Sequence, residues 1–475
     1  MPGLERGPRT VHLVGVGGAG MSGLARLLLA AGHRVTGSDR SESATLEALR
    51  ALGAEVWAGH DGARLGRPDL VVASTAIRPA NPELVAARIL GVPVLGRAQL
   101  LALLMAGKVG IAVAGTHGKT TTTGMVVAIL EAAGLDPSFA VGGDFKTSGI
   151  NAAAGTGPHF VAEADESDGS FLLYRPEIAI ITNVEPDHLD HYGSVAAVEA
   201  AFEEFCRRVL PGGLVVACGD DPGVREVVGR VAADLVARDV QVRFYGTGPD
   251  NDVRLIDLEL TPDGVRFGLR EQGSAGSEAL TVGPLTLRVP GAHNALNAAA
   301  AWTVSRYLGV DGAQALAALA TFGGTRRRFE AKGEAAGVRV VDDYSHHPTE
   351  VAAALASARS VVGSGRVIAV FQPHLFSRTR IFATDFGAAL SLADRVAVLD
   401  VYAAREDPEP GVTGELITDQ VRLPAADVAF CPEPADAVAA VVGWARPGDL
   451  VLTIGAGDVT ALGPQILRAL PGSTT

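Results

Sequence analysis

The sequence is poor in cysteine and carries fewer positive than negative charges. Cys206, Cys218 and Cys431 are its only cysteines. An odd number in so long a chain argues against a disulfide framework and indicates a reducing compartment. The 40 Lys and Arg residues stand against 53 Asp and Glu residues, which gives a formal net charge of −13. Because this field opposes a phosphate backbone, we expect no nucleic acid partner.

Long apolar runs are also missing. Charge, Gly or Pro interrupts every apolar stretch before about 18 residues, and the first ten residues, MPGLERGPRT, lack the apolar segment of a signal peptide. These absences predict a cytoplasmic protein without membrane insertion. Hydrophobic residues still make up 48% of the 475 residues, which is enough to fill several cores. A chain of this length predicts two to four domains.

Strands and helices are predicted to alternate in three separate stretches. The first begins with a strand at Val11–Val14 and a helix at Met21–Ala31, and the second with a strand at Gly110–Ala114 and a helix at Thr121–Ala133. The third begins with a strand at Val338–Val341. Such alternation is typical of parallel sheets. We therefore predict an α/β protein with three domains, at residues 1–106, 107–322 and 323–475.

The second stretch contains a segment of different character. From Val242 to Val289, short alternating strands are predicted, such as Val253–Leu260, Val265–Leu269 and Leu285–Val289, with turn residues between them. We expect them to form an antiparallel addition to the second domain.

The first glycine loop indicates a pyrophosphate site. Gly15, Gly17 and Gly20 form G-x-G-x-x-G between a strand and a helix, and Asp39 follows the next strand. This Rossmann-like pattern fits a dinucleotide, and it fits a uridine diphosphate sugar equally well. A tight turn without a ligand is the alternative, but five glycines between Gly15 and Gly23 argue against it.

The second glycine loop predicts a site for ATP and magnesium. Gly115-Thr116-His117-Gly118-Lys119-Thr120 follows a predicted strand and opens a helix. It supplies backbone donors, a lysine for phosphate oxygens and a hydroxyl for magnesium. The loop is shorter than a standard P-loop, because Val113 occupies the place of its first glycine. Ordinary nucleotide triphosphatases are therefore poorer matches.

Acidic residues lie at the end of the predicted strand Phe160–Glu163. Glu163, Asp165, Glu166 and Asp168 would lie at the carboxyl edge of the sheet, where oxygen ligands for a hard cation are expected. Glu163 is the expected metal bridge. His188 follows the next strand within another acidic segment, which favours a metal-binding role over a structural one.

These segments together resemble the Mur ligases of bacterial peptidoglycan synthesis. The shared motifs are GTHGKTTTT at Gly115–Thr123, the acidic AEADESDGSF and TNVEPDHLDHY at Thr182–Tyr192. Further motifs resemble the branch that joins L-alanine to UDP-N-acetylmuramate. They are GVGGAGMSG at Gly15–Gly23, GAHNALNAAAA at Gly291–Ala301, RRFE at Arg327–Glu330, DDYSHHPTE at Asp342–Glu350 and FQPHLFSRTR at Phe371–Arg380.

The resemblance covers nearly the whole chain and implies a role for each domain. A Rossmann-like first domain would bind the sugar nucleotide, an ATPase-like central domain would bind ATP, and a Rossmann-like last domain would bring the amino acid. The implied ATP contacts are Gly115, Thr116, His117, Gly118, Lys119, Thr120, Thr121, Asn294, Asn297, Arg328 and Asp343. The implied sugar-nucleotide contacts are Gly15, Gly17, Gly18, Gly20, Ser22, Asp39, Ser74 and Asn81. The implied amino-acid contacts are Tyr344, His346, His374, Arg378 and Arg380.

The resemblance also implies the catalytic groups and cofactors. Lys119, Glu163 and His188 would be catalytic, and Thr120, Glu163 and His188 would hold two magnesium ions, for which manganese can substitute. ATP would phosphorylate the lactyl carboxylate of UDP-N-acetylmuramate, and L-alanine would then attack the acyl phosphate, giving ADP and phosphate. The protein is expected to be a monomer or a weak homodimer.

Two positions depart from the family pattern. Leu375 stands where many members carry a basic residue. The predicted helix Val195–Arg208 contains no lysine, although other members carry a modified lysine there, so we predict no carbamylated lysine.

Three other functions compete with this hypothesis. A recycling ligase would join a tripeptide to the same sugar nucleotide, but Phe371–Arg380, interpreted as an alanine pocket, argues against it. A nicotinamide-dependent oxidoreductase built on Gly15–Gly20 would leave the second glycine loop unexplained. A regulatory protein without catalysis would not need Glu163 and His188 intact.

Overall fold

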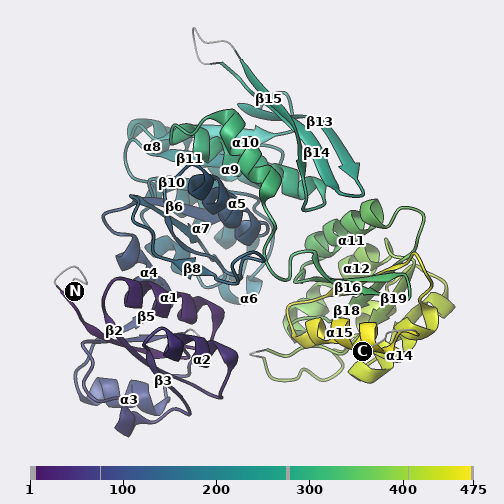
Figure 1. Cartoon of the computed structure of the whole chain (residues 1–475), viewed down its shortest axis with the longest axis horizontal. Helices are drawn as coiled ribbons and strands as arrows, with labels where there is room; N and C mark the ends of the chain where they lie inside the picture. The colour runs from purple at the N-terminus through teal and green to yellow at the C-terminus, as the bar shows by residue number, and fades with distance from the viewer. Residues whose placement is uncertain (1–6, 75, 274–278, 405, 472–475) are drawn as a thin grey trace. The chain divides into compact units, whose positions relative to one another are not determined.

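A computed structural model describes residues 7–74, 76–273, 279–404 and 406–471 of the chain. Three sheets, each with helices packed on it, make up the fold (Figure 1). Contacts group the chain into two compact units. One contains Met1–Leu255, Leu269–Gly283 and Leu296–Leu319, and the other contains Ile256–Gly268, Pro284–Ala295 and Ala320–Thr475. None of the helices in the described part of the chain has the length and hydropathy that a membrane span requires.

The first sheet has five parallel strands in the order β3-β2-β1-β4-β5. Its strands are β1 (Thr10–Val14), β2 (Arg34–Asp39), β3 (Glu55–Ala58), β4 (Leu70–Ala73) and β5 (Val94–Gly96), and its helices are α1 (Ala19–Ala30), α2 (Ala44–Ala51), α3 (Pro82–Ile89) and α4 (Arg97–Met105). The direction of the strand order changes at β1, where the first glycine loop leaves the sheet. In open α/β sheets, ligands bind at such a switch point.

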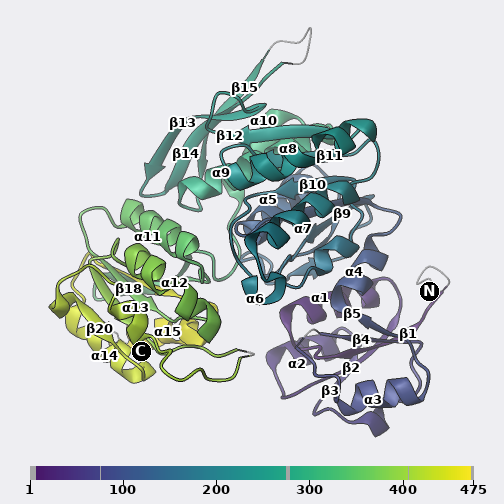
Figure 2. The ribbon, with the colours of Figure 1, turned by 180° about the vertical axis from the view of Figure 1, so that it is seen from behind.

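The second sheet has ten strands in the order β15-β14-β13-β12-β11-β10-β6-β9-β7-β8. Its strands are β6 (Val109–Ala114), β7 (Ser138–Ala140), β8 (Ala152–Ala153), β9 (His159–Glu163), β10 (Ile178–Ile181), β11 (Leu214–Cys218), β12 (Gln241–Gly246), β13 (Val253–Thr261), β14 (Gly264–Glu271) and β15 (Leu280–Leu287). Its helices are α5 (Lys119–Ala132), α6 (Leu189–Tyr192), α7 (Val195–Arg208), α8 (Pro222–Ala237), α9 (Ala292–Tyr307) and α10 (Gly312–Thr321). Helices α7 and α8 cover one face (Figure 2), and α5 lies on the opposite face.

The strands predicted as an antiparallel addition extend this second sheet at one edge. β13 pairs in parallel with β12, which lies at the start of the segment of predicted alternating strands. Only Pro262 and Asp263 separate β13 from its neighbour β14, and so short a connection joins antiparallel strands. The addition therefore continues the ATPase-like sheet.

The third sheet has six strands in the order β16-β17-β21-β18-β19-β20, with β16 antiparallel to β17. Its elements are β16 (Glu330–Ala335), β17 (Val338–Asp343), α11 (Pro348–Val362), β18 (Val367–Phe371), α12 (Phe376–Leu390), β19 (Arg395–Val398), α13 (Glu415–Thr418), β20 (Val428–Phe430), α14 (Pro434–Trp444), β21 (Leu450–Ile454) and α15 (Leu462–Ala469). Alternate residues of β18 belong to different cores. Val367 and Phe371 pack with α11 and α12, whereas Ile368 and Val370 pack with α14 and α15. The strand is apolar throughout because both of its faces are buried.

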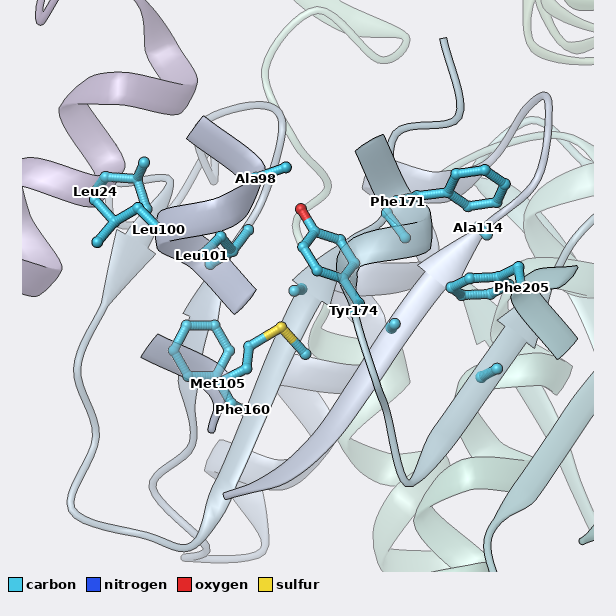
Figure 3. Packing of buried hydrophobic residues seen from close by; sticks show 14 of the residues in the cluster. Leu24, Ala98, Leu100, Leu101, Met105, Ala114, Phe160, Phe171, Tyr174 and Phe205 are labelled. Atoms are coloured by element: carbon cyan, nitrogen blue, oxygen red, sulfur yellow. The ribbon is translucent and has the colours of Figure 1, made fainter. Parts of the chain in front are cut away.

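One hydrophobic core runs from the first sheet into the second. Leu24 of α1 and Leu101 of α4 belong to the same buried cluster as Phe160 of β9 and Tyr174 (Figure 3). A hydrogen bond crosses the same junction, since the Asn151 amide nitrogen donates to the Ala19 carbonyl at 2.6 Å. The first and second glycine loops therefore belong to one packed unit.

Phe171 anchors the short turn that follows the acidic segment. Its ring stacks on Phe205 with centroids 5.0 Å apart and meets Phe202 edge-on at 5.5 Å. We expect Phe171→Ala to lower the free energy of unfolding by about 3–5 kcal/mol, because removal of a buried aromatic leaves a cavity. Urea unfolding of the purified variant measures this loss. The matched control is Leu173→Ala at a residue that is 45% exposed, for which we expect a change within about 0.5 kcal/mol. Equal losses for the two variants would contradict the prediction.

Candidate active site

The second glycine loop lies between β6 and α5, and its glycines are required by geometry. Gly115 has a φ of +131°, and a Cβ built there would lie 2.0 Å from the Thr182 hydroxyl oxygen. Gly118 has a φ of +81°, and a Cβ there would lie 2.7 Å from the Asn297 amide oxygen. A side chain at either position would therefore be strained as well as crowded. Asn297, predicted to contact ATP, thus lies against the loop.

Residues that follow β10 brace this loop from the adjacent strand. The Thr182 hydroxyl donates to the His117 carbonyl at 2.5 Å. Asn183 accepts a hydrogen bond from the His117 amide at 2.7 Å and donates back to its carbonyl at 3.2 Å. The Thr116 hydroxyl accepts one from the Glu185 amide at 2.9 Å. The motif TNVE therefore fixes the backbone of the phosphate loop.

Lys119 opens α5, and its ammonium group is nearly enclosed. It donates to the carbonyls of Gly115 and Thr116 at 2.7 and 3.1 Å and to a carboxylate oxygen of Glu166 at 2.9 Å. Burial by itself lowers the pKa of Lys119, but the charges of Glu166, Asp165 and Glu163 outweigh it and raise that pKa. Lys119 therefore keeps its positive charge at the head of the loop.

Glu166 is a partner of Lys119 that the sequence pattern does not single out. Its side chain is 2% exposed, and burial raises its pKa to about 7, although Lys119 opposes the shift. One carboxylate oxygen bonds Lys119, and the other has no hydrogen-bond partner among the described residues. His188 Nε2 lies 3.7 Å from the bonded oxygen. The structure therefore brings Lys119, Glu166 and His188 together.

The remaining acids complete a cluster suited to a divalent cation. A carboxylate oxygen of Glu163 accepts the Gly142 amide at 2.7 Å. Burial alone would raise the pKa of Asp165, but Lys119, a hydrogen bond from Ser167 and the Arg97 charge together lower it. Carboxylates are ligands that a hard cation prefers. A cation here would offset the excess negative charge around Lys119 and satisfy the second oxygen of the buried glutamate, so the residues present fit Mg²⁺.

The first glycine loop lies between β1 and α1, and its backbone is held by β2. The amides of Gly15 and Val16 donate to the Ser38 carbonyl at 2.8 and 3.0 Å. The Gly17 amide donates to Asp39 at 2.8 Å, so Asp39 orders the loop directly. In the described chain, the amides at positions 19 and 20 donate to no backbone carbonyl. Two backbone N–H donors at the amino terminus of α1 thus have no backbone acceptor, and an anion binds favourably at such a position.

Other predicted sugar-nucleotide residues also stabilise local backbone. The Ser22 hydroxyl donates to the Ala19 carbonyl at 3.0 Å. Asn81 caps α3 by accepting the Glu83 amide at 2.9 Å, and Ser74 accepts the Ala76 amide at 3.4 Å. These contacts order the turns that follow β1 and β4.

The predicted amino-acid residues gather beyond β17 and β18 in the other unit. The rings of Tyr344 and His346 lie 5.4 Å apart, and those of His346 and His374 lie 5.9 Å apart. His374 also stacks on Tyr402 at 5.9 Å. Tyr402 belongs to no motif, so the sequence pattern does not reveal it.

The arginines that follow on α12 differ in their surroundings. Arg378 is buried at 5% exposure, whereas Arg380 is exposed and pairs with Glu409 at 3.1 Å. Leu375, which precedes the helix, is buried at 4% exposure. An apolar residue there contributes packing instead of charge.

The segment RRFE lies beside Tyr344 in a strained conformation. Arg327 and Phe329 have φ values of +57° and +46°, which cost energy for residues other than glycine. The Phe329 amide donates to Asp343 at 2.8 Å, and the Arg328 guanidinium lies 5.4 Å from the Tyr344 ring. The turn therefore places Arg328 and Asp343 close to each other.

Asn294, the remaining predicted ATP contact, lies near the start of α9. Its side-chain amide donates to the Pro290 carbonyl at 2.6 Å. This bond ties the side chain to the backbone that leads into the helix.

Profiles of one protein family match almost the whole chain. The Mur ligase catalytic domain matches residues 10–109, the Mur ligase middle domain matches 113–305, and the glutamate ligase domain of Mur ligases matches 327–457. The chain belongs to the Mur ligase family.

Individual members of the family are similar to this chain over nearly its whole length. A UDP-N-acetylmuramate–L-alanine ligase from Kineococcus radiotolerans is 56% identical over 97% of this chain and 96% of its own length. One from Acidothermus cellulolyticus is 54% identical over 98% and 96%. The crystal structure of UDP-N-acetylmuramate-alanine ligase MurC from Thermotoga maritima matches with a TM-score of 0.78 at 30% identity, over 97% of this chain and 98% of that one. A murein peptide ligase from Psychrobacter arcticus matches with a TM-score of 0.70 at 25% identity, over 98% and 100%.

The raised pKa of Glu166 predicts a pH dependence of stability. Its ordinary value is 4.5 and its value here is about 7, so the folded protein holds a proton that the unfolded chain releases. The stability that this proton contributes is present at low pH and is lost as the pH rises from about 5 to 7. Over that interval, the free energy of unfolding of the wild type should fall relative to that of Glu166→Gln, by on the order of 2 kcal/mol.

Denaturant unfolding at several pH values, without metal or nucleotide, measures this difference. Glu259→Gln, at an exposed residue of β13, should follow the wild type at every pH. The same pH trend in Glu166→Gln as in the wild type would contradict the raised pKa.

Proposed function

We propose that this protein is an ATP-dependent ligase that joins L-alanine to the lactyl carboxylate of UDP-N-acetylmuramate, in cytoplasmic peptidoglycan precursor synthesis. The observation that carries the proposal is the buried Lys119 at the head of the glycine loop, hydrogen bonded to Glu166 and surrounded by carboxylates. This arrangement suits a triphosphate with its metal. The identity of 54–56% to alanine ligases along nearly the whole chain supports the choice of substrates.

ATP is proposed to bind in the second glycine loop. Lys119 would contact the phosphates, with the loop backbone from Gly115 to Thr121 as further donors. Thr120, Glu163 and His188 would hold the magnesium ions, which supply charge neutralisation for phosphoryl transfer. The rest of the nucleotide site would be Asn294, Asn297, Arg328 and Asp343.

The sugar nucleotide is proposed to bind at the carboxyl edge of the first sheet. The free amides at the amino terminus of α1 suit its diphosphate, and Asp39 holds the loop around them. The segments 1–106, 107–322 and 323–475 would thus carry the sugar nucleotide, ATP and the amino acid, respectively. The recycling ligase, which takes a tripeptide, is the second candidate because a murein peptide ligase shares the fold over 98% of this chain.

The chemistry requires two displacements. A carboxylate oxygen of the sugar nucleotide forms a bond to the γ-phosphorus of ATP, and the bond to ADP breaks. The neutral amine of alanine then forms the amide bond, phosphate leaves, and the amine loses a proton. Lys119 balances the charge that spreads over the phosphoryl oxygens. His346 and His374 lie among the amino-acid residues and, with His188, are the groups proposed to accept the proton.

The test of the substrates is phosphate release by the purified protein with ATP, magnesium and UDP-N-acetylmuramate. We expect release with L-alanine and none with the cell-wall tripeptide or without an acceptor. Release only with the tripeptide would assign the protein to the recycling branch. Phosphate release that neither acceptor increases, or no release with either of them, would refute both ligase functions.

Lys119→Met tests the site directly. Loss of a cation that stabilises the transition state should lower kcat by about 10²–10³-fold. Arg266→Met is the control, because Arg266 is exposed and pairs with the exposed Glu259, and it should keep kcat within about twofold of the wild type. Full activity of Lys119→Met would remove this loop from the mechanism.

A further inference from the structure

Arg97 lies between the two proposed nucleotide sites and has no role in the proposed function. It is the first residue of α4, directly after β5 of the first sheet. A Cβ built on Gly20 would lie 2.9 Å from Arg97 Cδ, 3.3 Å from Nη1 and 3.5 Å from Nε. The guanidinium therefore lies against the second residue of α1, and the absence of a side chain at Gly20 makes room for it.

The other side of Arg97 faces the acidic segment of the ATP site. Its Nη2 lies 3.8 Å from a carboxylate oxygen of Asp165. Asp165 precedes Glu166, the partner of Lys119. The Arg97 side chain thus reaches from the amino terminus of α1 to the acids beside the phosphate loop, within a single compact unit.

The hydrogen-bonding capacity of this guanidinium is unused by the described protein groups. Its ion pair with Asp165 is long, and its side chain is 27% exposed. Arg366 shows the contrast, because its guanidinium donates twice to Asp449 and once to the Trp444 carbonyl. A long, partly exposed ion pair contributes little to stability, so a structural link is a weak explanation for Arg97.

We infer that Arg97 binds an oxyanion of the sugar nucleotide. The inference rests on the proposed function for the identity of that ligand. A planar guanidinium fork fits either the diphosphate or the lactyl carboxylate, and the free amides of Ala19 and Gly20 lie at the same helix start. Asp165 lies 3.8 Å from the fork, on the side that faces the phosphate loop. Arg97 is thereby a binding residue that orients the sugar nucleotide toward ATP.

The experiment is calorimetric titration of the wild type, Arg97→Ala and Arg97→Lys with three ligands. These are UDP-N-acetylmuramate, UDP-N-acetylglucosamine, which has the diphosphate but no lactyl carboxylate, and ADP with magnesium. We expect Arg97→Ala to weaken the binding of UDP-N-acetylmuramate by at least about tenfold, through the loss of a charge-assisted pair. Arg97→Lys should recover part of that loss because it keeps the charge. Affinity for ADP should stay within about twofold of the wild type.

The two sugar nucleotides identify the oxyanion. An equal loss of affinity for both would show that Arg97 binds the diphosphate. A loss of affinity for UDP-N-acetylmuramate alone would show that it binds the lactyl carboxylate. Either result supports the inference. The control is Arg34→Ala, which removes an exposed guanidinium paired with Glu55 in the same domain and should change no affinity.

Two results would overturn the inference. One is wild-type affinity of Arg97→Ala for both sugar nucleotides. The other is a loss of affinity for all three ligands, including ADP, together with a lower melting temperature. That combination would indicate that Arg97 has a structural role. These two results come from binding measured without turnover. They can therefore be distinguished from a failure of the wild type to use L-alanine, which would refute the proposed function.

Discussion

The ion pair between Lys119 and Glu166 is the interaction around which the active site is arranged. Its two residues reach each other because β6 and β9 are parallel neighbours with Val113 opposite Glu163. Parallel strands end at the same edge, so the loop that leads to Lys119 and the segment that contains Glu166 leave the sheet side by side. An ammonium group this enclosed would be strongly destabilising without a carboxylate beside it. The order of strands in the sheet thus creates the charge distribution of the site.

Close backbone packing is the second constraint, and it explains glycines that a ligand motif alone does not. Gly20 leaves space for the Arg97 side chain, and Gly23 lies where a Cβ would approach the Ala152 Cβ within 3.1 Å. Gly17 donates its amide to the carboxylate at the end of β2. The run GVGGAGMSG therefore serves two purposes. It frees amides at the start of α1, and it lets the first domain pack against the second.

Local periodicity predicts the parts of the fold that depend on neighbours in the sequence, and it fails where contacts between distant segments determine the structure. Strands β6 and β18 are apolar throughout, and β21 is apolar apart from Thr453, because both of their faces are covered, so their positions follow from the sequence. Strand β12 mixes polar and apolar residues because several of its side chains are only partly buried, so the bounds of this strand do not follow from the sequence. The acidic segment is visible as a motif, but which carboxylate meets Lys119 depends on how the chain turns after β9. Arg97 belongs to no motif, and only the packing of α4 against α1 brings it to the glycine loop.

The hydrogen bonds of Lys119 also set a condition on catalysis. An ammonium group has three donors, and here all three are directed at the Gly115 carbonyl, the Thr116 carbonyl and Glu166. A phosphate oxygen that binds Lys119 must therefore replace one of these acceptors. Glu166 is the acceptor best able to give way, because its pKa of about 7 makes the uncharged form accessible near neutral pH, whereas the carbonyls are fixed by the loop. The carboxylate that stabilises the buried Lys119 can thus release one of its hydrogen bonds, which the ammonium group then donates to a phosphate oxygen of the substrate.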